Sequence, residues 1–248
     1  MKLTVLGCAG TFPSPDSPCS SYLVEAEGYR LVMDLGAGAL GALQRHVGLL
    51  DVDAVYLSHL HSDHCIDLVA YSYARRYHPD GVPPVLPVYG PKGTAERIRS
   101  AFEVPPPGDL LEVFDFREVP ESPWQLGPFT VTTAPMNHPI ECRGIRVEAG
   151  GRSLVYTGDT GECTALVELA TGADLLLCEA SWVDDAGSPP GVHLSGRQAA
   201  EHAAKADVGR LLLTHLVAWS DSAAITAEAR AAFDGPLEVV ASGRSYDV

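Results

Sequence analysis

The sequence predicts an α/β fold that forms one domain from residue 1 to residue 248. Apolar segments of strand length alternate with helical segments along the chain, a pattern typical of sheets covered by helices. The chain is long enough to bury one large core, so we expect no division into separate domains. Polar side chains directly follow several apolar segments, at the strand ends where ligand sites of α/β sheets collect.

Short apolar segments bounded by turn residues predict the strands. They cover residues 3–6, 21–25, 30–34, 54–58, 85–89, 129–133, 145–148, 153–157, 175–178 and 211–214. A turn at Gly28 separates the second strand from the third, and Gly150-Gly151 joins residues 145–148 to 153–157 as a hairpin. His59, Glu179 and His215 each come directly after one of these strands.

Helices and breaks complete this organisation. One helix is expected at residues 39–46, and Ser195 with Gln198 fits a capping box that begins an alanine-rich helix through residue 206. Proline and glycine mark breaks at residues 78–93 and at 105–108, which read Pro-Pro-Pro-Gly. A weak repeat of two halves divides near residue 120.

The charge balance restricts the class of partner. The formal net charge is −15, whereas proteins that bind large nucleic acids need basic surfaces for their phosphate contacts. We therefore expect no large RNA or DNA partner. A small phosphate substrate remains compatible, because bound divalent metals supply local positive charge.

Compartment and thiol chemistry follow from simple patterns. No apolar run is long enough to span a bilayer, and residues 1–7 read as a strand rather than a signal peptide, so a cytoplasmic protein without membrane contact is expected. The six cysteines include no C-x-x-C pair, so we expect reduced and mostly buried thiols. Cys65, next to His64, is interpreted as a packed small residue.

The strongest chemical signal is the run His59-Leu60-His61-Ser62-Asp63-His64. It places four potential metal ligands within six residues, on a loop after a strand. Neutral imidazole and carboxylate suit zinc, with iron or manganese also possible. A polar loop with chance histidines is the alternative, but three of the nine histidines of the chain fall within this run.

This run resembles the metallo-β-lactamase superfamily when it is followed by His138, by Gly158-Asp159 after a strand, and by Thr214-His215. The resemblance implies a four-layer αββα sandwich and a site for two divalent metals that activate water as the nucleophile. It also implies the metal ligands: His59, His61 and His138 for the first metal, Asp63, His64 and His215 for the second, and Asp159 as the bridge. Asp34 would orient one ligand, with a turn cap as the alternative.

Further residues resemble the ribonuclease Z branch of the superfamily. Many true β-lactamases carry cysteine at the position of Asp159, whereas phosphodiesterases and ribonuclease Z carry a carboxylate. The resemblance implies that His193 is the general acid for the leaving oxygen, that Glu179 orients it, and that Asp63 belongs with them to the catalytic group. A loop histidine that caps a helix is the alternative for His193.

The chain departs from ribonuclease Z itself in several ways. Only twenty residues lie between His138 and Asp159, which leaves no room for the long arm that grips tRNA in that family. Leu216-Val217-Ala218-Trp219 follows His215, where ribonuclease Z usually has serine and arginine. Together with the net charge, these departures weaken an RNA-processing interpretation.

A narrower resemblance extends over nearly the whole chain. The runs Arg75-Arg76-Tyr77-His78-Pro79 and Cys178-Glu179-Ala180-Ser181-Trp182 are similar to those of actinobacterial atypical class II cyclic nucleotide phosphodiesterases. The resemblance implies hydrolysis of the 3′ ester of cAMP or a related cyclic nucleotide to the 5′-monophosphate. It also implies a homodimer, as is common in the family.

The remaining aromatic and basic residues have two interpretations each. Trp182 or Trp219 would stack on a base, or would pack in the core or a dimer contact. Arg75 and Arg76 would help to place phosphate, although a solvated helix face is the favoured interpretation. His46, His78 and His202 lack metal-ligand spacing and are interpreted as structural or surface residues.

Several alternative functions stay open at this point. They are hydrolysis of another small phosphodiester, ribonuclease Z-like trimming of RNA 3′ ends, hydrolysis of a lactone, thioester or β-lactam, and a binding module without activity. The paired Glu179 and His193 favour phosphodiesters, because an alkoxide leaving group needs a proton. A module that had lost activity would be expected to lack at least one metal ligand, whereas every position is filled here.

Overall fold

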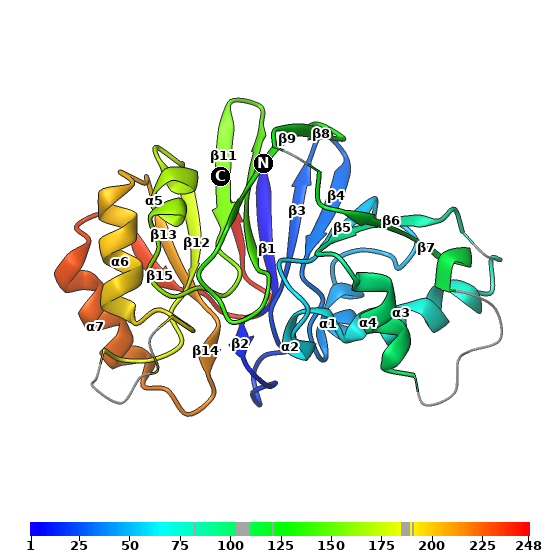
Figure 1. The fold of residues 1–248 in the computed structure, drawn as a ribbon, viewed down its shortest axis with the longest axis horizontal. Coiled ribbons are helices and arrows are strands. Elements are labelled where there is room, and N and C mark those ends of the chain that lie inside the picture. The colour runs from blue at the N-terminus through cyan, green and yellow to red at the C-terminus, as the bar shows by residue number, and fades with distance from the viewer. Residues whose placement is uncertain (82, 103–109, 121, 185–188, 190) are drawn as a thin grey trace.

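The computed structural model describes residues 1–81, 83–102, 110–120, 122–184, 189 and 191–248. Within these residues the chain forms two seven-stranded sheets that pack face to face, with helices on their outer sides (Figure 1). The predicted break at 105–108 lies outside the described residues. The arrangement is the αββα sandwich that the family resemblance implies.

The two sheets are best given in spatial order. The first contains β16 (Ser245–Asp247), β1 (Lys2–Gly7), β3 (Ser21–Ala26), β4 (Tyr29–Met33), β5 (Ala54–Tyr56), β6 (Leu86–Gly90) and β7 (Phe114–Glu118). The second contains β15 (Leu237–Val239), β13 (Leu211–Thr214), β12 (Leu175–Glu179), β11 (Arg152–Tyr156), β10 (Arg143–Ala149), β9 (Phe129–Pro135) and β8 (Trp124–Leu126). A small pairing joins β2 (Ala9–Gly10) to β14 (Leu216–Val217).

The helices cover the outer face of each sheet. Those beside the first sheet are α1 (Ala39–Leu43), α2 (Ser62–Cys65), α3 (Asp67–Arg76) and α4 (Thr94–Ser100), with the 3-10 turn η1 (Leu110–Glu112). Those beside the second sheet are α5 (Thr164–Ala170), α6 (Gly196–Lys205) and α7 (Ser222–Ala232). No helix in the described part of the chain is long and apolar enough to cross a bilayer.

Strand direction brings the polar strand ends together. In the first sheet β4, β5, β6 and β7 run parallel, and in the second sheet β11, β12, β13 and β15 run parallel. Parallel neighbours end at the same edge of their sheet. The residues that follow β4, β5, β11, β12 and β13 are therefore gathered along adjoining edges.

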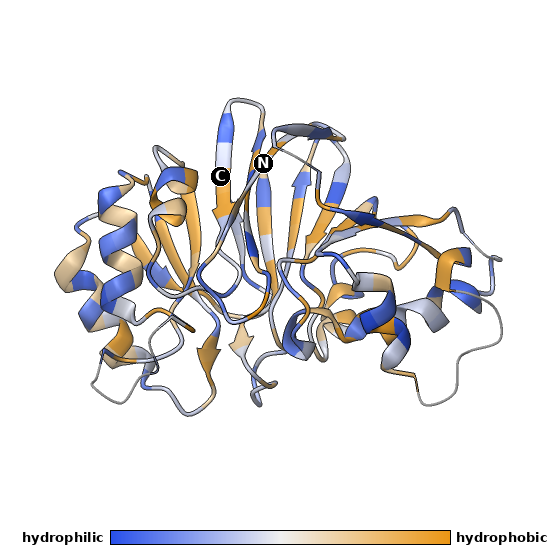
Figure 2. Ribbon diagram, in the orientation of Figure 1, coloured by the Kyte–Doolittle hydropathy of each residue, from blue (hydrophilic) through white to orange (hydrophobic). Residues whose placement is uncertain are grey.

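Side-chain burial explains the four layers. Along β12, Leu175 and Leu177 belong to the core between the sheets, whereas Leu176 and Cys178 belong to the core beneath the outer helices. Successive strand residues point to opposite faces, so a strand with both faces covered is apolar throughout. Figure 2 shows the same division, with largely apolar strands in the middle and helices of mixed polarity outside.

Buried tyrosines cross from one sheet to the other. The Tyr22 hydroxyl of β3 lies 2.6 Å from Oγ1 of Thr214 in β13, and the Tyr56 hydroxyl of β5 donates to the carbonyl of Arg143 in β10 at 2.8 Å. Buried polar groups need hydrogen-bond partners, so these contacts favour one relative placement of the sheets.

Most of the local predictions agree with the structure. Gly150 and Gly151 join β10 to β11 with φ values of 59° and 74°. Ser195 caps α6 as a capping box with Gln198. The predicted helix at 39–46 is wrong in its length, because α1 ends at Leu43 and tighter backbone bonds form the following turn.

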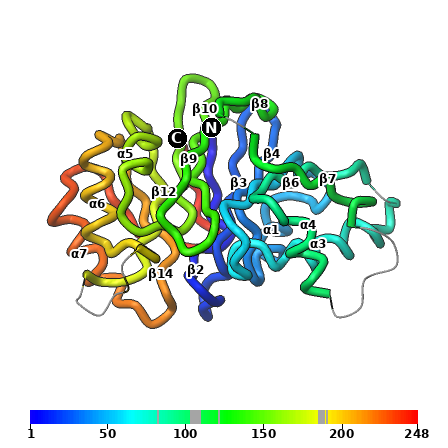
Figure 3. Tube along the Cα trace, in the orientation of Figure 1, coloured from blue at the N-terminus to red at the C-terminus, as the bar shows by residue number. Residues whose placement is uncertain are grey.

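The division into halves holds only in part. The first sheet ends with β7 and the second begins with β8, which agrees with a boundary near residue 120. However, β16 returns from the C-terminus and pairs with β1, where Lys2 lies opposite Asp247. The termini consequently lie side by side, as Figure 3 shows, with the Val248 amide donating to the Met1 carbonyl at 3.0 Å.

Arg75 corrects one prediction. Its side chain is 2% exposed, and its guanidinium donates to the backbone carbonyls of Val113 and Pro84 and lies over the ring of Tyr71. The solvated helix face is therefore wrong for this residue. The carbonyl acceptors come from distant loops, so no local pattern around Arg75 discloses them.

The cysteines agree with the prediction of reduced thiols. All six fall within the described residues and are free. Four of them are buried, namely Cys19, Cys65, Cys142 and Cys178. Cys65 donates to the carbonyl of Leu60 at 3.7 Å, in keeping with a packed small residue.

Candidate metal centre

The candidate ligands lie on segments that follow strands. His59 follows β5, and the short helix α2 presents Asp63 and His64 directly afterwards. The remaining candidates follow strands of the second sheet: His138 after β9, Asp159 after β11 and His215 after β13. The structure brings all of them, with His61, into two adjoining groups that share Asp159.

The first group holds three imidazoles and one carboxylate. His59 Nε2 lies 3.1 Å from His61 Nδ1, which lies 3.2 Å from His138 Nε2. Asp159 Oδ2 lies 3.5 Å from His59 Nε2. The ligand atoms of the four residues all lie within 4.8 Å of one another.

The second group uses the other oxygen of Asp159. His64 Nε2 lies 3.2 Å from His215 Nε2 and 3.2 Å from Asp159 Oδ1. Asp63 Oδ2 lies 3.3 Å from His215 Nε2 and 3.5 Å from His64 Nε2. Each group therefore combines nitrogen and oxygen donors, and the Asp159 carboxylate spans both.

These separations fit two metal ions. Tetrahedral zinc with bonds of about 2.0–2.1 Å would place its ligand atoms about 3.3 Å apart. The structure also leaves the buried Oδ1 atom of Asp159 without a hydrogen-bond partner among the described residues. A buried carboxylate oxygen needs such a partner or a cation. The donor set and this unpartnered oxygen both suit a bridging carboxylate between two metals.

The far nitrogen of most of these imidazoles has its own partner, which sets the ring orientation. The contacts, each between 2.7 and 3.0 Å, are His64 Nδ1 with Asp34 Oδ2, His59 Nδ1 with Ser58 Oγ, His215 Nδ1 with Ser181 Oγ, and His138 Nδ1 with the Val192 carbonyl. Such partners leave Nε2 of each ring for the metal position.

Asp34 is the most heavily bonded of these supports. It is fully buried and accepts hydrogen bonds of 2.7 Å from the amide and hydroxyl of Ser58 and from the hydroxyl of Tyr156. Its fourth contact is His64 Nδ1, also at 2.7 Å. The side chain thus holds groups from other strands, and the alternative of a turn cap does not describe these contacts.

Burial keeps the first group of histidines neutral. It lowers the pKa of His59 well below its ordinary value, and it also lowers the pKa values of His61 and His138. Metal ions bind imidazole in its neutral form. These three residues are therefore already in the protonation state that a metal requires.

The carboxylates are held in their ionised form. Burial opposes the charge of Asp159, but His215 and His64 bring its pKa well below the ordinary value. Burial likewise opposes the charge of Asp63, yet hydrogen bonds with His215 and His64 lower its pKa. The same contacts act on His64 in the opposite direction. Burial alone would lower the pKa of His64, but Asp159 and Asp34 raise it well above its ordinary value.

Glu179 and His193 form a hydrogen-bonded pair beside these groups. His193 Nδ1 lies 2.9 Å from Glu179 Oε1 and 3.9 Å from Asp159 Oδ2. Burial alone would lower the pKa of His193, but the Glu179 carboxylate raises it to about 9. The His193 ring also lies 5.2 Å from the His215 ring and 5.1 Å from the Trp182 ring, measured between centroids.

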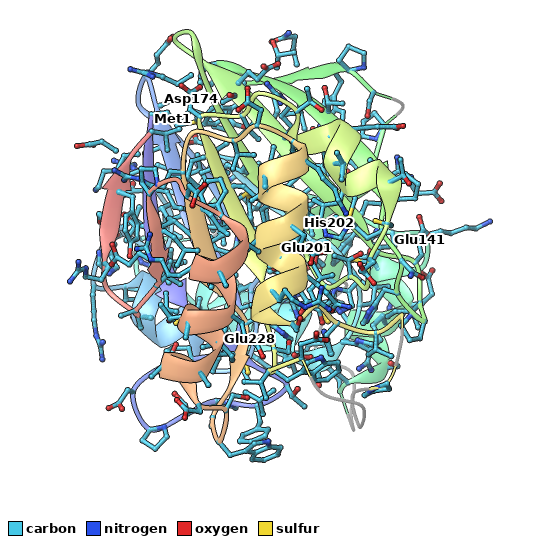
Figure 4. All side chains as sticks on the ribbon, turned by 90° about the vertical axis from the view of Figure 1, so that its left-hand side faces the viewer. Met1, Glu141, Asp174, Glu201, His202 and Glu228 are labelled. Atoms are coloured by element: carbon cyan, nitrogen blue, oxygen red, sulfur yellow. The ribbon has the colours of Figure 1, made fainter. Side chains whose placement is uncertain are left out.

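The other histidines lie apart from these groups, as the sequence predicts. His46 is exposed, and His78 lies 3.7 Å from Asp80 at the surface. His202 lies on the outer helix α6 (Figure 4), where its Nδ1 donates to the carbonyl of Gln198 and its Nε2 accepts from the amide of Cys163.

Several contacts in the site have no clear signal in the sequence. The amide of Thr11 donates to Asp63 Oδ2 at 2.9 Å, and Ser181 contacts both Glu179 and His215. Gly36 has a steric reason that only the structure shows, since a Cβ atom there would meet the Asp63 carbonyl oxygen at 1.9 Å.

Comparison with known proteins agrees with this geometry. A family model described as a β-lactamase superfamily domain matches residues 29–216. The chain belongs to the metallo-β-lactamase superfamily. The matched residues contain every member of the two candidate metal groups.

Relatives and a solved structure match almost the whole chain. An uncharacterised protein of Mycobacterium leprae is 45% identical over 255 residues, which cover 100% of this chain and 89% of that protein. A ribonuclease Z of Mycobacterium bovis is 33% identical over 248 residues, which cover 88% and 86% of the two chains. The crystal structure of the metallo-β-lactamase fold protein YhfI from Bacillus subtilis has a TM-score of 0.87 and 30% identity, with 99% and 98% of the chains covered. The chain is accordingly a metal-dependent hydrolase of this superfamily.

The bridging position of Asp159 leads to a prediction about metal content. Asp159→Ala removes a carboxylate that faces both groups, so it should reduce the zinc retained after dialysis from about two ions per chain to about one or fewer. Elemental analysis of the dialysed protein measures this. Asp115→Ala, which removes a surface ion pair with Arg117, is the control and should retain zinc as the parent does. Full retention by Asp159→Ala would contradict a bridging role.

Proposed function

We propose that this metallo-hydrolase is a phosphodiesterase for small cyclic nucleotides, which converts cAMP to 5′-AMP. The observation that carries the proposal is the hydrogen-bonded pair of Glu179 and His193 beside the two candidate metal groups. Hydrolysis of a phosphodiester needs an activated water on one side and a protonated leaving oxygen on the other. The two halves of that requirement correspond to the metal groups and to this pair.

The metal ligands in this proposal follow the two groups. His59, His61 and His138 would hold one ion, Asp63, His64 and His215 the other, and Asp159 both. We propose zinc, since the donors are imidazoles and carboxylates, a set that iron and manganese also accept. When bound, the two ions polarise the phosphate and lower the pKa of water.

His193 would deliver the proton to the leaving oxygen. Its Nδ1 is held by Glu179, so Nε2 is the atom left for the substrate. The 3′ oxygen of ribose is a poor leaving group unless it is protonated. An acid in this position favours cleavage of an alkyl phosphodiester over hydrolysis of a thioester, whose thiolate leaves without a proton.

The chain between His138 and Asp159 favours a small substrate. These residues form the compact hairpin of β10 and β11 within the second sheet. With a net charge of −15, the chain also lacks the excess of basic residues that a polynucleotide partner requires. A ribonuclease Z-like activity on RNA 3′ ends is the second candidate, because a ribonuclease Z is 33% identical over most of this chain.

An aromatic pair on the loops that flank the site would recognise the base. Trp219 is 79% exposed and its ring centroid lies 4.9 Å from that of Phe12. Phe12 follows Thr11, whose amide contacts Asp63, and Trp219 follows His215 by four residues. Both loops are therefore attached to the second metal group. An exposed aromatic face in this place suits stacking on a nucleobase.

The direct test is a substrate panel. Zinc-loaded protein is incubated with cAMP, cGMP, 2′,3′-cyclic nucleotides and a precursor tRNA, and the products are identified by chromatography. We expect conversion of cAMP to 5′-AMP, with loss of this activity in Asp159→Ala. Cleavage of the precursor tRNA alone would favour the ribonuclease Z-like candidate instead.

The general acid is tested by the leaving group. His193→Ala should slow turnover of cAMP by about 10²- to 10⁴-fold, because the ribose oxygen then leaves without its proton. Bis(p-nitrophenyl) phosphate should lose much less, since nitrophenolate leaves unaided, and zinc content should not change. The exposed His46→Ala variant is the control. Undiminished cAMP turnover in His193→Ala would remove this assignment.

Base stacking is tested by the Michaelis constant. Trp219→Ala should raise KM for cAMP by about 5- to 150-fold, which corresponds to about 1–3 kcal/mol of stacking. A cyclic ribose phosphate without a base should show no such change. Tyr77→Ala, which removes another exposed aromatic side chain at the end of α3, serves as control. An unchanged KM for cAMP would show that Trp219 does not stack on the base.

A further inference from the structure

Ser181 lies between the second metal group and the Glu179–His193 pair. It follows β12 by two residues and is fully buried. Its hydroxyl lies 3.0 Å from Glu179 Oε2, 3.0 Å from His215 Nδ1 and 3.1 Å from the His215 carbonyl oxygen. One hydroxyl group thus contacts a candidate metal ligand and the support of the candidate acid.

The orientation of the His215 ring determines which group donates in the hydrogen bond between Ser181 and His215. Its Nε2 faces His64 Nε2 at 3.2 Å and Asp63 Oδ2 at 3.3 Å, so it is the atom that meets a metal ion. Metal binding requires a free lone pair on Nε2, which leaves the imidazole hydrogen on Nδ1. Nδ1–H then donates to the Ser181 oxygen.

The hydrogen of Ser181 is thereby free for Glu179. The hydroxyl has two acceptors at similar distances, the carboxylate of Glu179 and the carbonyl of His215. A bond to an ionised acceptor is the stronger of the two. Glu179 Oε2 therefore receives the Ser181 hydrogen.

The other oxygen of Glu179 holds His193. Oε1 accepts from the amide of Thr160 at 2.6 Å and from Nδ1 of His193 at 2.9 Å, and Oε2 also accepts from the amide of Leu194 at 3.3 Å. The carboxylate is fully buried, so the loss of any donor leaves its negative charge less stabilised.

We propose that Ser181 is a positioning residue that couples metal binding at His215 to the assembly of the Glu179–His193 acid pair. With Nε2 of His215 engaged, the bonds run from His215 Nδ1 to Ser181, and from Ser181 to Glu179, which holds His193 by Nδ1. In the other tautomer of His215, Nδ1 accepts the Ser181 hydrogen and Glu179 loses that donor. A metal ion at the second position therefore favours the arrangement in which Ser181 donates to Glu179, the arrangement that best supports the bond between Glu179 and His193. This inference rests on the proposed function for its catalytic consequence, but its hydrogen bonds do not.

The test compares Ser181→Ala with Ser181→Thr, which keeps a hydroxyl. Loss of a hydrogen-bond partner of a metal-binding histidine costs about 10- to 100-fold in metal affinity or activity. We expect Ser181→Ala to weaken zinc retention by about that factor in competition with a chelator. It should also slow turnover of an alkyl diester such as cAMP more than that of bis(p-nitrophenyl) phosphate, because only the alkyl diester needs the acid. Ser181→Thr should restore both properties at least in part.

Ser58→Ala is the matched control. Ser58 contacts Nδ1 of His59 at 3.0 Å, as Ser181 contacts Nδ1 of His215, but it has no contact with Glu179 or His193 among the described residues. Its loss should weaken zinc binding without any preference between the two leaving groups. A purely structural role of Ser181 would make the two alanine variants alike.

A substrate-free measurement separates this inference from the proposed function. Nitrogen-15 spectra of the imidazoles in the zinc-loaded parent protein should show the hydrogen of His215 on Nδ1. In zinc-loaded Ser181→Ala, the Nδ1–H signal of His193 should differ from that of the parent. A parent protein that cleaves neither diester would defeat the proposed function alone. Unchanged His193 signals together with unchanged zinc retention in Ser181→Ala would overturn the coupling, whatever the substrate.

Discussion

The burial of charged carboxylates where the two sheets meet is the constraint on which the rest of the site depends. Asp34 and Asp159 are almost fully buried, and removing an unpaired carboxylate from water is strongly unfavourable. Asp34 meets this constraint with four hydrogen bonds, whereas Asp159 faces imidazoles and one of its oxygens has no hydrogen-bond donor in the part of the chain that the structure describes. The structure therefore reserves a place for cations at Asp159 and provides rigid support at Asp34.

Two residues of the site also have a strained backbone conformation. Asp34 and His215 have φ values of 57° and 59°, in the left-handed region that non-glycine residues seldom adopt. Each sits directly after a strand that has a parallel neighbour. Such strain costs about 1–3 kcal/mol per residue and persists only where surrounding contacts hold it. The hydrogen bonds of Asp34 and the Ser181 contacts of His215 are those restraints.

The sequence predicts the strand framework well because its signals are local. Apolar runs, the glycine pair at 150–151 and the capping box at Ser195 each act within a few residues. The run from His59 to His64 is equally local, so a metal site could be expected from it. The family resemblance predicts the later candidates, His138, Asp159 and His215, as partners of that run, and the position of Asp159 and His215 after strands also favours them.

Other features depend on contacts between distant segments, and no local pattern encodes them. The pairing of β16 with β1 joins the two ends of the chain, and the carbonyls that receive Arg75 come from separate loops. In the sequence, Ser181 is only one residue of the run from Cys178 to Trp182. Its relation to His215, 34 positions further on, appears only when β12 and β13 are placed side by side.

Both halves of the sandwich are needed to make one site. The segment after β5 in the first sheet, which includes α2, supplies His59, His61, Asp63 and His64, and segments after strands of the second sheet supply the remaining groups. Hydrogen bonds also cross between the sheets, between Tyr22 and Thr214 and from Tyr156 to Asp34. A ligand that binds only the folded state stabilises it by mass action. Metal ions bound between the halves would therefore hold the sheets in the relative position that the tyrosine contacts already favour, so that formation of the site and docking of the sheets reinforce each other.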